Sequence, residues 1–214
     1  MIEAAAPFSE LEITKEFKMA VFKNFFAMLA RMKYINRWGL MRNTITENIA
    51  EHSLDTAVLA HGLAVIGNTY FGKNLDEERT AVLALFHDTT EIITGDLPTP
   101  IKYFAPEIKV AYKNVEAAAG NKLLKALPRE MRPVYQPIIH GEDDEKELWK
   151  YVKAADKLSA LIKCVEERRM GNMDFEQAYD ATLKAIKDMN MPEVDYFLET
   201  FLPAYSLTLD EQSK

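Results

Sequence analysis

Cysteine is almost absent from this chain of 214 residues, which contains a single one, Cys164. A lone cysteine cannot form a disulfide within the chain, and we expect it to be a small buried apolar residue. Apolar runs are also short: the stretch from Ala81 to Phe86 is far below the ~20 residues that a membrane span needs. The N-terminus lacks a basic region ahead of an apolar segment. We therefore expect a cytoplasmic protein with no signal peptide and no membrane partner.

Positive charge is the second shortage. The 26 lysine and arginine residues are outnumbered by 33 aspartate and glutamate residues, which gives a net charge of −7. A negative surface repels polyanions, so we expect no polynucleotide partner, although a local basic group can still hold a small anion. The apolar content of 48% is sufficient for a sizeable core in one large domain or two small ones.

The chain also lacks the alternating apolar and polar pattern of a half-buried strand, and its apolar residues recur at helical spacing. This spacing predicts an all-α fold. Gly95 and Gly171 mark expected helix ends, and Asp76 marks an expected start. The expected helices lie at roughly 15–34, 50–69, 76–94, 106–126, 129–139, 143–170, 174–189 and 192–202.

Against this background, four dispersed residues stand out: His52, the adjacent pair His87 and Asp88, and Asp156. Two imidazoles and two carboxylates suit a first-row divalent cation, whereas Ca²⁺ prefers oxygen ligands almost exclusively. A lone histidine or aspartate in a helix is more often a packed or solvated residue. Four of them, each on a predicted helix, together favour a metal site and metal-assisted hydrolysis.

The helical repeat decides which neighbours join this group. At about 100° per residue, Glu91 lies about 40° from His87 and about 60° from Asp88, so all three can face one cavity. His61 falls about 180° from His52 on its own helix, and we assign it to packing. Two irregular segments, residues 36–43 and 95–100, flank the group, and the prolines of the second predict a stiff loop.

The order H…HD…D resembles that of the HD-domain metal-dependent phosphohydrolases, and within them the bacterial HD-domain 5′-deoxynucleotidases. The resemblance covers about residues 22 to 212 and implies a single-domain HD-domain helical bundle. It divides the chain into an extension at 1–20, the domain at 21–206 and a tail at 207–214. The strings that carry it are Phe25-Phe26-Ala27, Ile35-Asn36-Arg37-Trp38, Leu40-Met41-Arg42-Asn43, Thr46-Glu47-Asn48, Glu51-His52-Ser53-Leu54, Thr94-Gly95-Asp96-Leu97-Pro98-Thr99-Pro100 and Asp195-Tyr196-Phe197.

The resemblance implies that the protein removes the 5′-phosphate from deoxyribonucleoside monophosphates with one divalent cation, Co²⁺, Mn²⁺ or a similar metal, as a homodimer. It implies catalytic roles for Glu91 and Arg37, with Arg37 on the phosphate and Trp38 against the sugar. The implied metal ligands are His52, His87, Asp88 and Asp156. The implied substrate-binding residues are Arg37, Trp38, His52, Asp88, Asp96, Leu97, Pro98, Thr99 and Asp156.

Three alternatives stay open. Dinuclear relatives place two further histidines between the HD pair and the last aspartate, where this chain has only His140, which we expect at a helix end. Phosphohydrolases that act on triphosphates or guanosine polyphosphates need more basic residues than the flanking loops supply, namely Arg37, Arg42 and Lys102. A catalytically silent nucleotide-binding module is the third alternative, and it would not require Glu91.

Overall fold

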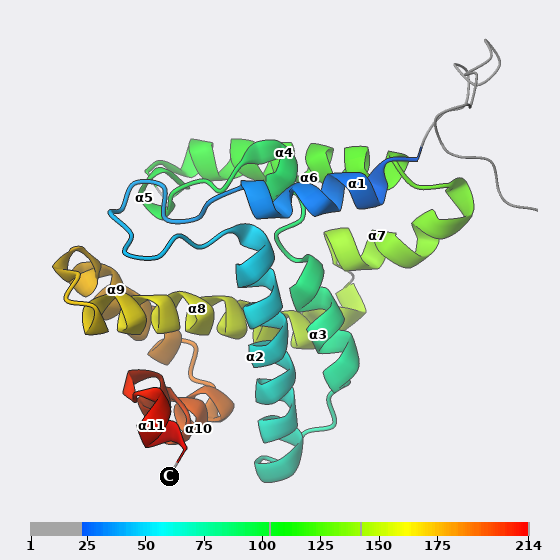
Figure 1. Cartoon of the computed structure of the whole chain (residues 1–214). Helices are drawn as coiled ribbons and strands as arrows, with labels where there is room; N and C mark the ends of the chain where they lie inside the picture. The colour runs from blue at the N-terminus through cyan, green and yellow to red at the C-terminus, as the bar shows by residue number, and fades with distance from the viewer. Residues whose placement is uncertain (1–22, 103, 142, 214) are drawn as a thin grey trace, which may run out of the picture.

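The computed structural model describes residues 23–102, 104–141 and 143–213, and these residues form helices joined by short connections (Figure 1). Within them no strand forms, and the bridge between Asn36 and Asn48 is the one isolated β-pairing. The α-helices are α1 (Phe25–Leu29), α2 (Ile49–Tyr70), α3 (Glu77–Phe86), α4 (Glu91–Thr94), α5 (Thr99–Lys102), α6 (Pro106–Lys125), α7 (Arg132–His140), α8 (Lys146–Arg169), α9 (Glu176–Lys187), α10 (Pro192–Thr200) and α11 (Leu209–Gln212). This architecture confirms the expected all-α fold.

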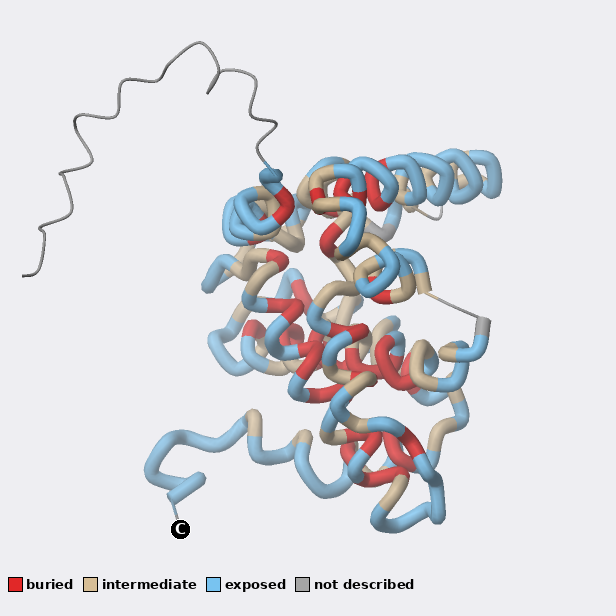
Figure 2. The backbone as a smooth tube through the Cα atoms, turned by 90° about the vertical axis from the view of Figure 1, so that its right-hand side faces the viewer, coloured by how far each residue is buried: buried red, intermediate tan, exposed pale blue. Residues whose placement is uncertain are grey.

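The larger core surrounds α2 and α8. Helix α2 packs along both α3 and α8, and α8 also packs against α9 (Figure 1). Leu63, Leu83 and Leu158, one from each of the three central helices, are fully buried in this core. Figure 2 shows buried positions gathered in the middle of the molecule. Each such leucine contributes about 2 kcal/mol or more through the apolar surface that it removes from water.

A second, smaller core lies beneath α6. Phe25 of α1 packs there against Leu123, Leu124 and Leu127, and Tyr135 of α7 covers it edge-on at a ring distance of 4.9 Å. Helices α1, α4, α6 and α7 form a layer over one end of α2 and α3 (Figure 1). The first turns of α2 and the end of α3 therefore lie between the two cores.

Helix α2 begins at a complete capping box. The Asn48 side chain accepts hydrogen bonds from the backbone of Ala50 and Glu51, and the Glu51 carboxylate accepts one from the Asn48 backbone. Such a cap satisfies amide groups that the first turn leaves without partners. It fixes where the helix starts and thereby places His52 in its first turn, where the side chain is fully buried.

The segment before α2 is closed into a loop and fastened to α8. Ile49 N donates to Ile35 O at 2.9 Å, and Arg37 N donates to Glu47 O at 2.9 Å, so the two ends of the loop run side by side. From α8, the buried Glu167 carboxylate accepts from Thr44 N and pairs with Lys163. Burial alone would raise the pKa of Glu167, but hydrogen bonds from Lys163, Asn172 and Thr44 lower it to about 2. The carboxylate is therefore ionised.

The expected helix at 76–94 is broken in the structure, so that prediction was wrong. Helix α3 ends at Phe86, residues 87–90 form turns, and α4 starts at Glu91. His87 N donates to Ala84 O and Glu91 N donates to Asp88 O. Each of these hydrogen bonds joins residues three positions apart, as in a 3₁₀ helix, so the backbone is wound more tightly here than in an α-helix. The angular argument from a continuous helix does not apply across this break.

Other expected boundaries shift at their ends. The helix expected at 15–34 is described only from residue 23, and it tightens into a 3₁₀ helix at Ala30–Tyr34. The stiff loop expected at 95–100 runs into α5, and the expected tail contains α11. His61 is exposed, so its assignment to packing was wrong, whereas Cys164 is buried as expected. Within the described residues, no helix combines the length and apolar character needed to cross a membrane.

Replacing Glu167 with alanine tests the attachment of the loop to α8. We expect the free energy of unfolding in urea at pH 7 to fall by about 3–5 kcal/mol, because Lys163 is left buried without a counter-charge. Glu166→Ala is the matched control, since Glu166 is exposed. A depressed pKa stabilises the folded state above the ordinary value of 4.5. The deficit should therefore be constant above about pH 5 and shrink as the pH falls towards 2; equal losses in both variants would contradict this account.

Candidate active site

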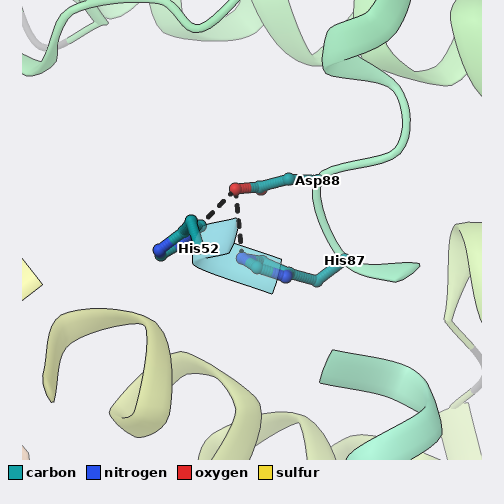
Figure 3. A group of neighbouring side chains, drawn as sticks. All are labelled: His52, His87 and Asp88. Carbon is teal, nitrogen blue, oxygen red and sulfur yellow. Dashed lines mark ion pairs between the residues drawn. The ribbon is translucent and has the colours of Figure 1, made fainter. Parts of the chain in front are cut away.

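Three helices and one loop bring the site together. His52 comes from the first turn of α2, His87 caps the end of α3, and Asp156 lies midway along α8. Asp88 follows His87 in the turn that breaks the expected helix, which directs its carboxylate towards both imidazoles (Figure 3). The break in the helix therefore shapes the site.

The side-chain atoms converge on one oxygen of Asp88. Its Oδ2 lies 3.1 Å from His87 Nε2 and 3.4 Å from His52 Nε2 (Figure 3). The three residues offer ligand atoms that all lie within 4.8 Å of one another. Asp156 Oδ1 lies 3.2 Å from His52 Nε2, so the fourth predicted ligand is adjacent to this group without belonging to its tightest set.

In each imidazole, the hydrogen-bond partner of Nδ1 decides whether Nε2 has a lone pair available for a metal. His87 Nδ1 lies 2.7 Å from the carbonyl oxygen of Ala84, which can only accept, so Nδ1 carries the proton and Nε2 the lone pair. His87 Nε2 is buried and forms no hydrogen bond within the described residues. His52 Nδ1 faces Ser159 Oγ at 3.0 Å and Glu47 Oε1 at 3.7 Å, which likewise leaves Nε2 turned to the aspartates.

This concentration of acceptors shifts the proton equilibria of the group. Burial alone would lower the pKa of His52, but Asp156, Asp88 and Glu47 raise it well above its ordinary value. Burial would raise the pKa of Asp88, yet the charge of His87 and a hydrogen bond from His52 lower it well below its ordinary value. Without a bound cation, His52 therefore carries a proton on Nε2 as well as on Nδ1, and a cation bound there would take the place of the Nε2 proton.

These residues fit a divalent cation. An orphaned imidazole nitrogen, a second imidazole nitrogen and a carboxylate oxygen converge at close range, and each imidazole is oriented by a partner on its other nitrogen. Such partners on the far side of the ring are typical of metal-binding histidines. The nitrogen and oxygen donors suit a first-row metal such as Zn²⁺, Co²⁺ or Mn²⁺.

Arg37 borders the group on the side of the loop. Its Nη1 lies 3.6 Å from Asp88 Oδ2, and its Nε lies 3.4 Å from Glu47 Oε2. The neighbouring Trp38 donates from Nε1 to Glu47 Oε2 at 2.8 Å and packs against Phe175 at a ring distance of 5.3 Å. Trp38 has a φ of 58°, a conformation that a bulky residue rarely adopts and that local contacts must hold.

Two further carboxylates face the same region. Glu91 is 7% exposed, and burial together with the charges of Asp88 and Asp96 raises its pKa to about 9. Burial also raises the pKa of Asp96, against the opposing effects of Arg37 and a hydrogen bond from the Trp38 backbone. A buried carboxyl with a raised pKa is suited to hold or transfer a proton.

Comparison with known proteins identifies the family of this chain. Residues 24–205 match the family described as 5′-deoxynucleotidase YfbR-like. A 5′-deoxynucleotidase of Vibrio vulnificus is 48% identical over 190 residues, which are 89% of this chain and 98% of that protein. The chain belongs to the YfbR-like 5′-deoxynucleotidase family.

Two solved structures share the fold of this family member. An HD-domain phosphohydrolase from Listeria innocua superposes with a TM-score of 0.75 at 24% identity, covering 89% of this chain and 92% of that one. The HD phosphohydrolase DatZ of cyanophage S-2L, bound to dA and one catalytic Zn²⁺ ion, has a TM-score of 0.59 at 19% identity, covering 83% and 95%. These likenesses confirm the single-domain HD-domain fold.

The structure brings together most of the residues that the sequence singled out. His52, His87 and Asp88 form the compact group, Asp156 touches His52, and Arg37 touches Asp88. Leu97 and Pro98 lie partly buried between α4 and α5, and their role in nucleoside binding stays a prediction. The side chain of Thr99 and the whole of the proposed N-terminal extension at 1–20 lie outside the described residues, as does the boundary between this extension and the domain.

Sequence reasoning assigned no role to Glu47 or Ser159. Glu47 is nine residues from Trp38 and ten from Arg37, and it reaches them because the bridge between Asn36 and Asn48 folds the loop back on itself. Its place in the Thr46-Glu47-Asn48 string was the available signal. Ser159 is three residues after Asp156, so both face His52 from α8, a helical spacing that could have revealed it.

Exchange of one imidazole tests the metal assignment. We expect His87→Gln to lower the affinity for Co²⁺ by ~100-fold or more, because it removes a ligand that its Ala84 contact holds in place. Equilibrium dialysis of the metal-stripped protein measures the affinity without substrate. His61→Gln is the control, since His61 is exposed on α2. Equal affinities in the wild type and His87→Gln would contradict the assignment.

Proposed function

We propose that this protein is a metal-dependent 5′-deoxynucleotidase that converts deoxyribonucleoside 5′-monophosphates into deoxynucleosides and inorganic phosphate. The observation that carries the proposal is the meeting of His52, His87 and Asp88 beside Arg37, whose Nη1 lies 3.6 Å from the same Asp88 oxygen. A cation-binding group next to a guanidinium suits a phosphate ester. Relatives that carry the name 5′-deoxynucleotidase and match nearly the full length of this chain support the same reaction.

In the proposed reaction, water attacks phosphorus, the bond to the 5′-oxygen breaks, and the deoxynucleoside leaves with a proton. One divalent cation, which His52, His87, Asp88 and Asp156 would hold, would lower the pKa of a water molecule bound to it and neutralise charge on the phosphate. Arg37 binds phosphate oxygens through its Nη atoms and stabilises the charge that builds on them. Glu91 orients the attacking water or handles its proton.

A monophosphate fits the distribution of positive charge better than a longer phosphate chain does. Of the basic residues in the flanking loops, Arg42 pairs with Asp174 at 3.2 Å and Lys102 pairs with Glu116 at 3.5 Å. Arg37 is the one whose guanidinium contacts the cation-binding group in the described residues. His140 is exposed at the end of α7, and this favours one metal ion over two.

Trp38 is the proposed determinant of deoxyribose selectivity. Its indole is held by Glu47 and Phe175 directly beside Arg37, so a nucleotide whose phosphate binds Arg37 brings its sugar to this ring. A fixed indole at C2′ leaves a 2′-hydroxyl neither room nor a partner. Asp96, Leu97, Pro98 and Thr99 then line the nucleoside side of the pocket.

The protein is also proposed to act as a homodimer in the cytoplasm. A reduced, buried Cys164 is consistent with that compartment. Exposed apolar side chains on the face of α2 that borders a cavity of about 460 Å³, namely Leu54 and Val58, offer surface for a second copy.

A substrate and metal panel tests the proposed function. We expect phosphate release from deoxyribonucleoside monophosphates with added Co²⁺ or Mn²⁺, none after chelation, and slower release from AMP than from dAMP. Glu91→Gln should reduce kcat by ~10²–10⁴-fold, because it removes the group that handles the proton. Glu78→Gln, at an exposed position of α3, is the control.

Three results would contradict parts of this assignment. Absence of phosphate release with every metal would favour a nucleotide-binding module. Faster turnover of dATP or guanosine polyphosphates than of any monophosphate would favour the related phosphohydrolases. Equal turnover of AMP and dAMP would remove the proposed role of Trp38.

A further inference from the structure

Glu47 contacts three residues of the proposed site, but it is neither a proposed metal ligand nor a proposed catalytic residue. We propose that Glu47 is a positioning residue that couples the phosphate-binding Arg37 to the metal-binding His52. This inference rests on the proposed function for the part that concerns Arg37. The part that concerns His52 rests on the geometry of the cation-binding group alone.

One carboxylate oxygen of Glu47 holds the loop residues. Its Oε2 accepts from Trp38 Nε1 at 2.8 Å and lies 3.4 Å from Arg37 Nε, while the backbone oxygen of Glu47 accepts from Arg37 N at 2.9 Å. Arg37 is thus held by a backbone hydrogen bond and by an ion pair at Nε, which forms no hydrogen bond within the described residues. Its Nη1 is left turned to Asp88 at 3.6 Å, where a phosphate bound at the cation-binding group would meet it. A guanidinium fixed in this way loses little freedom on binding an anion.

The other oxygen of Glu47 faces the far side of His52. Oε1 lies 3.7 Å from His52 Nδ1, which also meets Ser159 Oγ at 3.0 Å. A carboxylate can only accept, so it favours the tautomer whose Nε2 lone pair points to Asp88 and Asp156. A hydroxyl such as that of Ser159 accepts or donates and does not by itself select a tautomer. The carboxylate therefore adds a preference that Ser159 does not supply.

The side chain of Glu47 is not required to begin α2. The capping hydrogen bonds at this helix come from Asn48 and Glu51, and the loop is fastened to α8 through the backbone of Thr44 and Ile45. Glu47 has 12% of its side-chain surface exposed, and its three side-chain partners all belong to the proposed site. Its contacts therefore serve the arrangement of the site more than the stability of the fold.

Glu47→Gln, compared with Glu51→Gln, tests the coupling. Glu51 is exposed, lies four residues later, and hydrogen-bonds the Asn48 backbone. We expect Glu47→Gln to weaken Co²⁺ binding without substrate by roughly tenfold, the lower range for loss of a group that orients a ligand. At saturating Co²⁺ it should raise KM for dAMP by about tenfold with a smaller change in kcat. Glu51→Gln should alter neither value by more than about twofold.

A double-mutant cycle with Arg37→Ala separates positioning from a general structural effect. If Glu47 acts on the substrate through Arg37, the further rise in KM caused by Glu47→Gln should fall below about twofold in the Arg37→Ala background. A full additional rise would overturn the coupling, as would an unchanged Co²⁺ affinity and KM in Glu47→Gln. If the wild type releases no phosphate from any monophosphate, the proposed function fails, while the Co²⁺ titration still decides whether Glu47 acts on His52.

Discussion

The site at the centre of this protein depends on positive charge, because the fold holds two imidazole nitrogens and a carboxylate oxygen close together. Asp88 Oδ2 lies 3.1 Å from His87 Nε2 and 3.4 Å from His52 Nε2, and each imidazole has a partner on its other nitrogen that keeps it from turning away. Such a group is stable only beside positive charge, which Arg37 supplies in part and a divalent cation would complete. The roles proposed for Arg37 and Glu91 follow from their position around this charge.

The rest of the fold carries that constraint. The larger core fixes α2, α3 and α8 and with them the two histidines and Asp156, whereas the loop before α2 is irregular and needs its own support. Lys163 and Glu167 give that support from α8. The loop in turn delivers Arg37, Trp38 and Glu47 to the group. Helices α2 and α8 and the turn after α3 would provide the metal ligands, and an anchored loop would provide the residues that recognise the substrate.

Periodicity sufficed to predict the helices because apolar spacing is a local property. The proposed ligands were singled out by their residue types and by the H…HD…D order, and the structure brings His52, His87 and Asp88 together. The break between α3 and α4 was missed because the run from Leu83 to Glu91 has no glycine or proline to mark it. Its tight turn is held by local side-chain hydrogen bonds, from His87 Nδ1 to Ala84 O and from Thr89 Oγ1 to Phe86 O. The contacts of Glu47 were missed because they depend on a bridge that closes the loop across more than ten residues. His61 was wrongly assigned to packing because its angular position on the helix shows only that it lies on the face opposite His52. The angle does not show whether another part of the chain covers that face, and His61 is exposed.

The most direct test is crystallographic. Crystals grown with Co²⁺ and dAMP in the Glu91→Gln protein, with diffraction recorded on both sides of the cobalt absorption edge, locate the metal and the nucleotide together. The account predicts one anomalous peak about 2 Å from His52 Nε2, His87 Nε2, an Asp88 oxygen and an Asp156 oxygen, with the phosphate between that peak and Arg37. A metal peak bound by other residues, or a phosphate bound away from Arg37, would contradict it.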